Sequence, residues 1–415
     1  MDSYLIFALV MIIILFLFIK LWLSMRHASK RLQQIPEVPG GLPIIGHLIS
    51  LIRRPPWDTL SQWVLQYGPI IRFNLFGRQI IAINDRDMLK RVLQLKFTTY
   101  QKDKFTYGPF MCLLGTGLVT SEGPLWKQQR GFIAPTLRVE ILEETGEIVK
   151  SAVNRLCKKL DNFKKSGEVV EIGEEFRKLT LQVIVEAILS LPADESDRVF
   201  PELYLPIVEE ANRRTWYPFR AFLPLPATFR QTRAIKELNQ YVTNLIIKRR
   251  NEYLQGNKTP DILGRILTSI DGQPWDEKLQ LQLRDEIKTF LFAGHETSSA
   301  MLTWTLYELT RNPEVLEKVK KEANETFKDP NNFPSFDIIR DGLQYTQACL
   351  KEALRKYSIV PVVTRQLAED DDLCGIPVPA NTIVVVPIQA VHNDPTLWPD
   401  PQTVCFSLFC FLYFC

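Results

Sequence analysis

The stretch "FLFAGHETSS", Phe290 to Ser299, lies inside an apolar segment without proline that extends from Leu279 to Arg311. As one helix, about 33 residues would span roughly 50 Å, which is long enough to cross a whole domain. Beyond residue 286 the segment is mainly apolar on several faces, as expected of a helix that is surrounded by other elements. The sequence therefore predicts a central helix, around which the rest of the fold is organised.

Polar residues interrupt this helix near its middle. Gly294 disfavours the helix by up to about 1 kcal/mol relative to alanine, and Thr297 can donate a hydrogen bond back to the carbonyl of Ala293. Together they predict a polar notch, with Glu296 as a candidate proton source. The alternative is a close crossing of two helices at Gly294. The zinc signature H-E-x-x-H is not completed because position 299 is serine, so no metal site is predicted.

Two further motifs each place charged residues on a predicted helix. Glu352 and Arg355 are three residues apart and share one helical face; their helix leads into "IVPVVTR", which ends at Arg365. Trp126 and Arg130 are four residues apart within "GPLWKQQRGF", where an aromatic ring and a guanidinium can hold the edge of an anion. Each motif also has an ordinary interpretation. The first can be a solvated ion pair, and the second a core tryptophan beside a surface arginine.

The N-terminus predicts a membrane anchor. Residues 4–23 form an apolar run of about one bilayer thickness, and its one charge, Lys20, can snorkel to the interface. No small-residue cleavage site follows, and basic residues come next, which places the remainder in the cytosol. A buried core helix is the alternative. We predict a signal anchor over residues 1–25, a basic and proline-rich hinge over 26–45, and one globular domain from residue 46 onward.

Composition limits the function classes. The 415 residues are 46% hydrophobic and 23% charged, with a net charge of +3. This balance is that of a globular protein and gives no nucleic-acid footprint. The seven cysteines include no C-x-x-C pair, which argues against a disulfide framework or a zinc ribbon and fits a reducing compartment.

The expected secondary structure is mainly helical, an α+β arrangement with a small sheet. A hairpin is predicted at 70–83, and further strands at 362–367 and 382–388. Helices are predicted at 140–160, 176–191, 225–253, 279–311, 313–327 and 343–357. The helix at 313 is expected to begin with Asn312 as N-cap and Pro313 in its first position.

Taken in this order and at these intervals, the motifs resemble those of the cytochrome P-450 monooxygenases of the microsomal type, over residues 1 to about 403. A-G-x-x-T matches Ala293, Gly294 and Thr297, while E-x-x-R and W-x-x-x-R match the two pairs described above. "HNDPTLWPDP", residues 392–401, is similar to the segment that precedes the family's haem-binding region. The resemblance implies the cytochrome P-450 fold with haem as cofactor. It also implies electrons from NADPH-cytochrome P-450 reductase and a single-pass location in the endoplasmic reticulum membrane, with the globular domain cytosolic.

The resemblance also implies residue roles. Ala293, Gly294 and Thr297 would hold O₂ and relay protons, with Glu296 behind them. Trp126, Arg130 and Arg365 would bind haem propionates, and Glu352 with Arg355 would form a structural pair. Apolar residues at 105–118 and 359–363 would line the pocket, which favours a lipophilic small molecule as substrate.

The end of the chain departs from the family. After residue 403 the sequence reads "VCFSLFCFLYFC" (404–415), without the family's F-x-x-G-x-R-x-C-x-G loop. We therefore expect residues 46–403 to form a C-terminally incomplete cytochrome P-450-like domain without its haem-ligand loop, with an atypical apolar tail and doubtful haem retention. A non-catalytic membrane fragment that acts only through interactions is the alternative. A membrane-anchored hydrolase finds no support, because G-x-S-x-G is absent.

Overall fold

The structure is a computed structural model that describes residues 31–404, apart from residues 138, 218–219, 221–222, 224 and 330–333. The predicted membrane anchor over residues 1–25 therefore lies outside the described residues, as does nearly all of the apolar tail. Within the described ranges, no helix is both long and apolar enough to cross a membrane.

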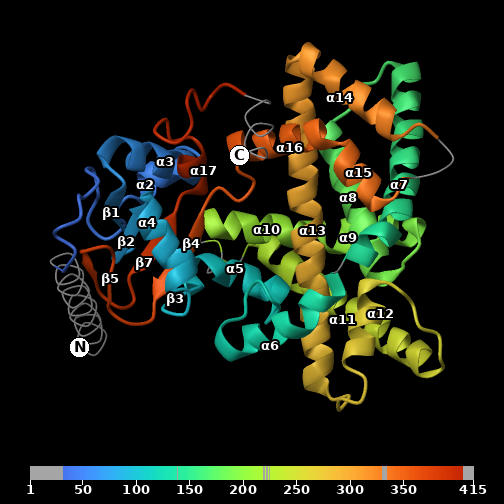
Figure 1. The fold of residues 1–415 in the computed structure, drawn as a ribbon. Coiled ribbons are helices and arrows are strands. Elements are labelled where there is room, and N and C mark those ends of the chain that lie inside the picture. Colours follow the sequence, from blue (N-terminus) through green and yellow to red (C-terminus); the bar gives the residue numbers. More distant parts are fainter. Residues whose placement is uncertain are drawn as a thin grey trace. The chain divides into compact units, whose positions relative to one another are not determined.

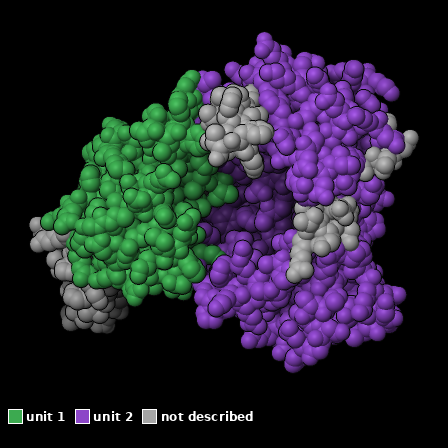
Figure 2. All heavy atoms as spheres, in the orientation of Figure 1, with its two compact units in different colours: residues 1–104, 360–402 green, residues 105–359, 403–415 purple. Residues whose placement is uncertain are grey.

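The chain forms two compact units (Figure 2). Unit 1 comprises residues 1–104 and 360–402, and unit 2 comprises residues 105–359 and 403–415. Unit 1 is thus built from two distant parts of the sequence, whereas the predicted central helix belongs entirely to unit 2.

Unit 1 is organised around a five-stranded sheet of order β1-β2-β7-β4-β3. Its strands are β1 (Ile70–Leu75), β2 (Arg78–Ile83), β3 (Tyr100–Gln101), β4 (Val363–Leu367) and β7 (Ile383–Val386). Strands β2 and β7 pair in parallel and the other neighbours are antiparallel. A short two-stranded sheet joins β5 (Asp371–Asp372) to β6 (Pro377–Val378). The predicted hairpin and both predicted later strands are confirmed.

Short helices complete unit 1. They are α2 (Leu48–Ile52), α3 (Pro56–Tyr67), α4 (Arg86–Lys90), the π-helix η1 (Arg91–Leu95) and α17 (Ile388–His392). The predicted hinge is not free of the unit: Ile35 and Val38 are buried, and Arg72 Nε on β1 donates to the Ile35 carbonyl at 2.9 Å. The proline-rich segment therefore packs along the edge of the sheet.

Unit 2 is helical. Its elements are α5 (Lys104–Leu114), α6 (Gly123–Ile133), the 3₁₀ turn η2 (Ala134–Leu137), α7 (Val139–Ser166), α8 (Ile172–Leu189), α9 (Ala193–Leu203), α10 (Leu205–Trp216), α11 (Pro226–Leu254), α12 (Ile262–Ser269), α13 (Glu277–Arg311), α14 (Pro313–Thr326), α15 (Phe336–Gly342) and α16 (Gln344–Lys356). Helix α13 is the long gold helix of Figure 1, and it packs most extensively against α8, with α16 and α11 as further neighbours.

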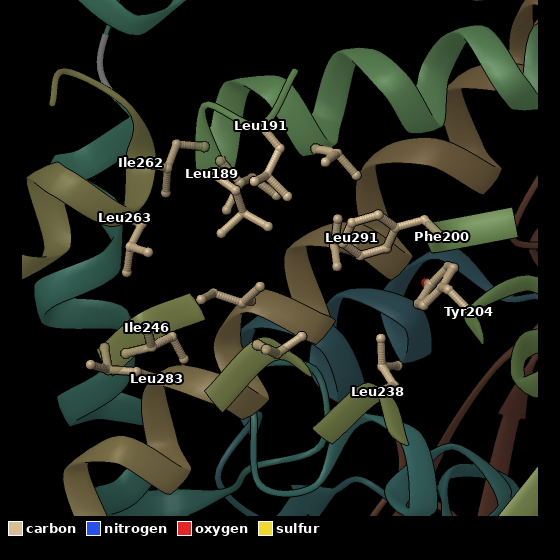
Figure 3. Packing of buried hydrophobic residues seen from close by; sticks show 14 of the residues in the cluster. Leu189, Leu191, Phe200, Tyr204, Leu238, Ile246, Ile262, Leu263, Leu283 and Leu291 are labelled. Atoms are coloured by element: carbon tan, nitrogen blue, oxygen red, sulfur yellow. The ribbon is translucent and has the colours of Figure 1, made fainter. Parts of the chain in front are cut away.

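The main core of unit 2 lies where α8, α11, α12 and α13 meet. Leu189, Leu283 and Leu291 are almost fully buried there, and Figure 3 shows Phe200 and Tyr204 beside Leu291. Because α13 contributes residues along much of its length, the prediction of a central helix is confirmed.

The predicted start of α14 is confirmed, with Asn312 in the N-cap position and Pro313 as the first helical residue. The Asn312 side chain, however, makes no capping hydrogen bond to that helix. Its amide instead donates backward to the Glu308 carbonyl at 2.8 Å, at the end of α13. A side chain at the junction of two helices can serve either terminus, and here it satisfies an orphan carbonyl of the preceding one.

Candidate active site

Helix α13 carries the predicted motif of Ala293, Gly294 and Thr297 in one of its middle turns. Thr297 Oγ1 donates to the Ala293 carbonyl at 2.6 Å, which confirms the expected back-bond. Ala293 is exposed and Thr297 is partly exposed. The helix is nevertheless α-helical without a break from Glu277 to Arg311. The motif is therefore a hydroxyl and a small residue on an intact helix surface, and not an opening in the helical ladder.

Gly294 lies on another face of α13, which packs against α8. A Cβ atom at this position would lie 2.7 Å from both Cδ1 and Cγ1 of Ile184, closer than real Cβ atoms approach. The close helix crossing that was the alternative interpretation therefore exists. It accounts for Gly294 by packing, which leaves Ala293 and Thr297 as the motif's outward-facing members.

Glu296 is held as an anion. Its Oε1 atom accepts from Arg177 Nη2 of α8 at 2.8 Å and lies 3.3 Å from His295 Nε2. Burial alone would raise the pKa of Glu296, but His295 and the charge of Arg177 outweigh it, and the pKa is lowered. In this geometry Glu296 is an acceptor, so the proton-source role predicted for it requires a proton held by a neighbour.

A second polar cluster on α13 was not predicted. The loop between α5 and α6 donates two backbone N–H groups to consecutive carboxylates: Thr116 N to Asp285 Oδ2 and Leu118 N to Glu286 Oε2, both at 3.0 Å. Gly115, with a φ of 57°, is required there, because a Cβ atom would collide with the Asp285 carboxylate. These bonds fix the predicted pocket-lining loop to the central helix.

Charge pairing makes this cluster tolerable in the interior. Lys288 is almost fully buried and bonds Asp285 at 2.9 Å and Asn239 of α11 at 2.8 Å. Burial raises the pKa of Glu286 to about 7, with a smaller upward effect from Asp285. A signal existed in the sequence, since "RDEIKT" places four charges in a helix that must be buried beyond that point. Spacing alone did not predict which residues would pair with these charges.

The predicted propionate-binding residues are divided between the units. On α6 of unit 2, the Arg130 guanidinium lies 5.8 Å from the centre of the Trp126 ring. Arg130 is exposed. Arg365 belongs to β4 of unit 1, where Nη1 donates to the Thr364 carbonyl at 2.7 Å. Trp126 and Arg130 thus do share a face, as their spacing predicted.

Glu352 and Arg355 form a buried pair on α16. Arg355 donates through Nε and Nη2 to the two carboxylate oxygens of Glu352, each at 2.8 Å. The two side chains are 1% and 4% exposed, respectively, so the interpretation as a solvated ion pair was wrong. Arg355 Nη2 also approaches the Thr403 carbonyl at 3.5 Å.

The haem implied by the resemblance is matched only in part. An exposed guanidinium stacked on an indole, as at Arg130 and Trp126, suits a propionate. The axial thiolate is not matched, because none of the four described cysteines lies in a loop whose backbone N–H groups would donate hydrogen bonds to a thiolate. Cys112 donates its thiol to the Pro109 carbonyl within α5, Cys157 is exposed on α7, and Cys349 is buried in an apolar cluster.

Cys374 lies in unit 1, where slight burial and the charge of Asp85 raise the pKa of its thiol. This disfavours the thiolate that an axial ligand requires. The described residues therefore suit the cofactor's edge and do not supply its iron ligand.

Comparison with known proteins gives consistent relatives. A family model described as Cytochrome P450 matches residues 36–408. Cytochrome P450 4c21 of Blattella germanica is 28% identical, over 95% of this chain and 82% of that protein. Protein LUTEIN DEFICIENT 5, chloroplastic, of Arabidopsis thaliana is 27% identical, over 89% of this chain and 62% of that protein. Cytochrome P450 4V2 of Rattus norvegicus is 25% identical, over 92% and 77%. The chain therefore belongs to the cytochrome P450 family, and its membership implies haem as cofactor and monooxygenase activity.

Proposed function

We propose that this protein acts, in a form that carries the family's haem-ligand loop, as a membrane-bound monooxygenase of the endoplasmic reticulum that hydroxylates a lipophilic substrate. It would use O₂ and electrons from NADPH delivered by a cytochrome P450 reductase. Haem, when bound, supplies the oxygen-activating chemistry of the family. The chain's own residues supply the surroundings of that chemistry, and α13 carries the observation on which the proposal rests: a threonine hydroxyl one turn from an exposed alanine on the central helix.

An apolar wall adjoins this motif. Phe292, next to Ala293, contacts Phe110 of α5 with ring centroids 5.3 Å apart. Met111 on the same helix is 41% exposed. Apolar side chains that adjoin Ala293 in this way favour a substrate with a large hydrocarbon surface and few polar groups. The predicted substrate class is therefore supported by the composition of this wall.

The Thr297 hydroxyl has a specific part in this proposal. Its hydrogen bond to the Ala293 carbonyl fixes the rotamer, while the oxygen can still accept a hydrogen bond from a donor above the helix. We infer that it holds and passes a proton, with Glu296 as the carboxylate behind it. Trp126, Arg130 and Arg365 would bind the propionates, and the Glu352–Arg355 pair would hold α16 in place.

Substitution of Thr297 tests this role. In a form that carries the family's haem-ligand loop, Thr297→Ala should leave folding and haem content nearly unchanged but reduce product per NADPH on the order of tenfold, the low end of general acid–base effects. Thr297→Ser should retain most activity. Thr303→Ala is the matched control, because Thr303 makes the same back-bond at 2.7 Å, to the Ser299 carbonyl. Equal coupling in the two alanine variants would refute the role.

The alternative, a non-catalytic membrane protein that acts through interactions, is favoured by one observation. No described cysteine has a loop suited to axial ligation, and "VCFSLFCFLYFC" offers no arginine or glycine near its three cysteines. The chain of this sequence, expressed alone, is therefore expected to lack the absorption band of a thiolate-ligated, reduced, carbon-monoxide-bound haem. A stable band of that kind would eliminate the alternative and assign the ligand to a cysteine of this chain.

A further inference from the structure

His295, in the same turn of α13, has one ring nitrogen whose role is fixed. The imidazole is fully buried, and Nδ1 lies 3.1 Å from the Leu291 carbonyl oxygen. A carbonyl oxygen can only accept a hydrogen bond, so Nδ1 must carry a hydrogen. In a neutral imidazole the other nitrogen, Nε2, would then carry a lone pair.

That second nitrogen faces a carboxylate. Nε2 lies 3.3 Å from Glu296 Oε1, and within the part of the chain that the structure describes it has no well-formed hydrogen bond. A lone pair directed at an anion is unfavourable in a buried position. An imidazolium, which donates through both nitrogens, removes the conflict. The contact therefore favours one additional proton shared between His295 and Glu296.

The charges around the pair point the same way. Arg177 contacts two carboxylates, Glu296 at 2.8 Å and Glu174 at 3.2 Å. One guanidinium between two carboxylates leaves a net negative charge, which an imidazolium at His295 neutralises. Glu174 is about half exposed, so solvent screens part of its charge. Glu296 is the carboxylate that lies against His295.

A further neighbour of His295, Tyr204, is uncharged. The Tyr204 ring packs edge-on against the imidazole, with centroids 5.3 Å apart, and lies in the apolar core of unit 2 (Figure 3). Burial, and then the charge of Glu296, raise the pKa of Tyr204 well above its ordinary value. Its hydroxyl therefore stays protonated and adds no charge beside His295 and Glu296.

We propose that His295 is a positioning residue that stores a proton for Glu296 on the buried side of α13. The proton moves from Nε2 to Oε1, which leaves a neutral imidazole and a neutral carboxyl group. The carboxyl group then releases it on its partly exposed side, and reloading from solvent follows the same path in reverse, because His295 itself has no exposed surface. The use of this proton in turnover rests on the proposed function, whereas its storage does not.

Nitrogen NMR of the full chain in detergent, labelled only at histidine, tests the storage directly. The sequence has four histidines, and His295→Gln assigns the signal of interest. At pH 7 His295 should show two protonated nitrogens, and Glu296→Gln should remove the Nε2 proton. A neutral His295 in the unsubstituted chain, or a cationic one in both chains, would overturn the proposal.

The chain offers two matched controls. His47 is also buried, but its Nε2 lies against the Val38 carbonyl at 2.9 Å and not against a carboxylate, so Glu296→Gln should leave its signal unchanged. Tyr204→Phe keeps the ring and removes the hydroxyl, and His295 should remain cationic. Loss of the charge in Tyr204→Phe would contradict the assignment of Glu296 as the partner.

Turnover separates this inference from the proposed function. In the haem-loaded form that carries the family's haem-ligand loop, His295→Gln should lower product per NADPH on the order of tenfold and change the pH profile of coupling, with substrate affinity retained. A cationic His295 with unchanged coupling and pH profile would refute the delivery role alone. A neutral His295 in an enzyme that still depends on Thr297 would refute the storage while leaving the proposed function intact.

Discussion

Replacement of Glu352 by alanine is expected to destabilise α16 more than any exposed ion-pair substitution in this chain. The carboxylate accepts two hydrogen bonds from Arg355, both at 2.8 Å, and the two side chains are 1% and 4% exposed. Charge-assisted hydrogen bonds contribute about 1.5–3 kcal/mol each. Loss of both therefore agrees with the roughly 3–5 kcal/mol expected when one partner of a buried pair is removed.

The double variant distinguishes pairing from simple packing. Glu352→Met with Arg355→Met removes both charges and keeps apolar volume, and replacement of a buried pair by apolar residues is often neutral. We therefore expect it to be more stable than Glu352→Ala. In the cycle completed by Glu352→Met and Arg355→Met alone, the coupling energy should be at least about 2 kcal/mol. Lys320 and Glu317 provide the matched control: they have the same spacing and a distance of 2.7 Å, but their side chains are 56% and 70% exposed. Glu317→Ala should cost below about 1 kcal/mol.

Amide hydrogen exchange in α16 measures the effect locally, which suits a chain with two compact units. The opening free energy of this helix should fall by about 3–5 kcal/mol in Glu352→Ala and recover in the double variant. Such a loss is a large share of a typical domain stability of about 5–15 kcal/mol, so poor accumulation of the single variant is also expected. Equal losses in the Glu352 and Glu317 variants would refute the reasoning that burial sets the magnitude.

Three further predictions concern other parts of the chain. Because burial raises the pKa of Glu286 from 4.5 to about 7, the folded state holds a proton that the unfolded state releases between those values. Stability should therefore fall as pH rises through that window, by up to about 3 kcal/mol, and Glu286→Gln should abolish the slope in pH-dependent unfolding; an unchanged slope would point to another group. Gly294→Ala should destabilise unit 2 by about 1–3 kcal/mol through overpacking against Ile184, measured by urea unfolding, and Ile184→Ala should relieve it; no relief would show that the crossing is not the cause. Protease treatment of intact microsomes should degrade epitopes beyond residue 50, since the basic residues after the apolar run favour a cytosolic domain; their protection would contradict this topology.

Much of the fold could be predicted because its signals are local. Apolar periodicity identified α13 and the other long helices, and β-rich runs broken at Gly77 identified the hairpin of β1 and β2. Side-chain spacing also placed Thr297 one turn from Ala293, and Glu352 one turn from Arg355. These pairings depend on the geometry of a single helix, so no knowledge of distant segments was needed.

Which of these residues are buried, and which side chains they contact, follows only from how the helices pack. Spacing could not distinguish a buried Glu352–Arg355 pair from a solvated one, because burial depends on neighbouring helices. Gly294, Glu296 and Asp285 also contact α8 or the loop before α6, more than a hundred residues away. Local periodicity carries no information about such distant partners. Local patterns were enough to predict the helices, the motif on α13 and the family resemblance, whereas the burial and the long-range partners of the carboxylates depend on how distant helices pack.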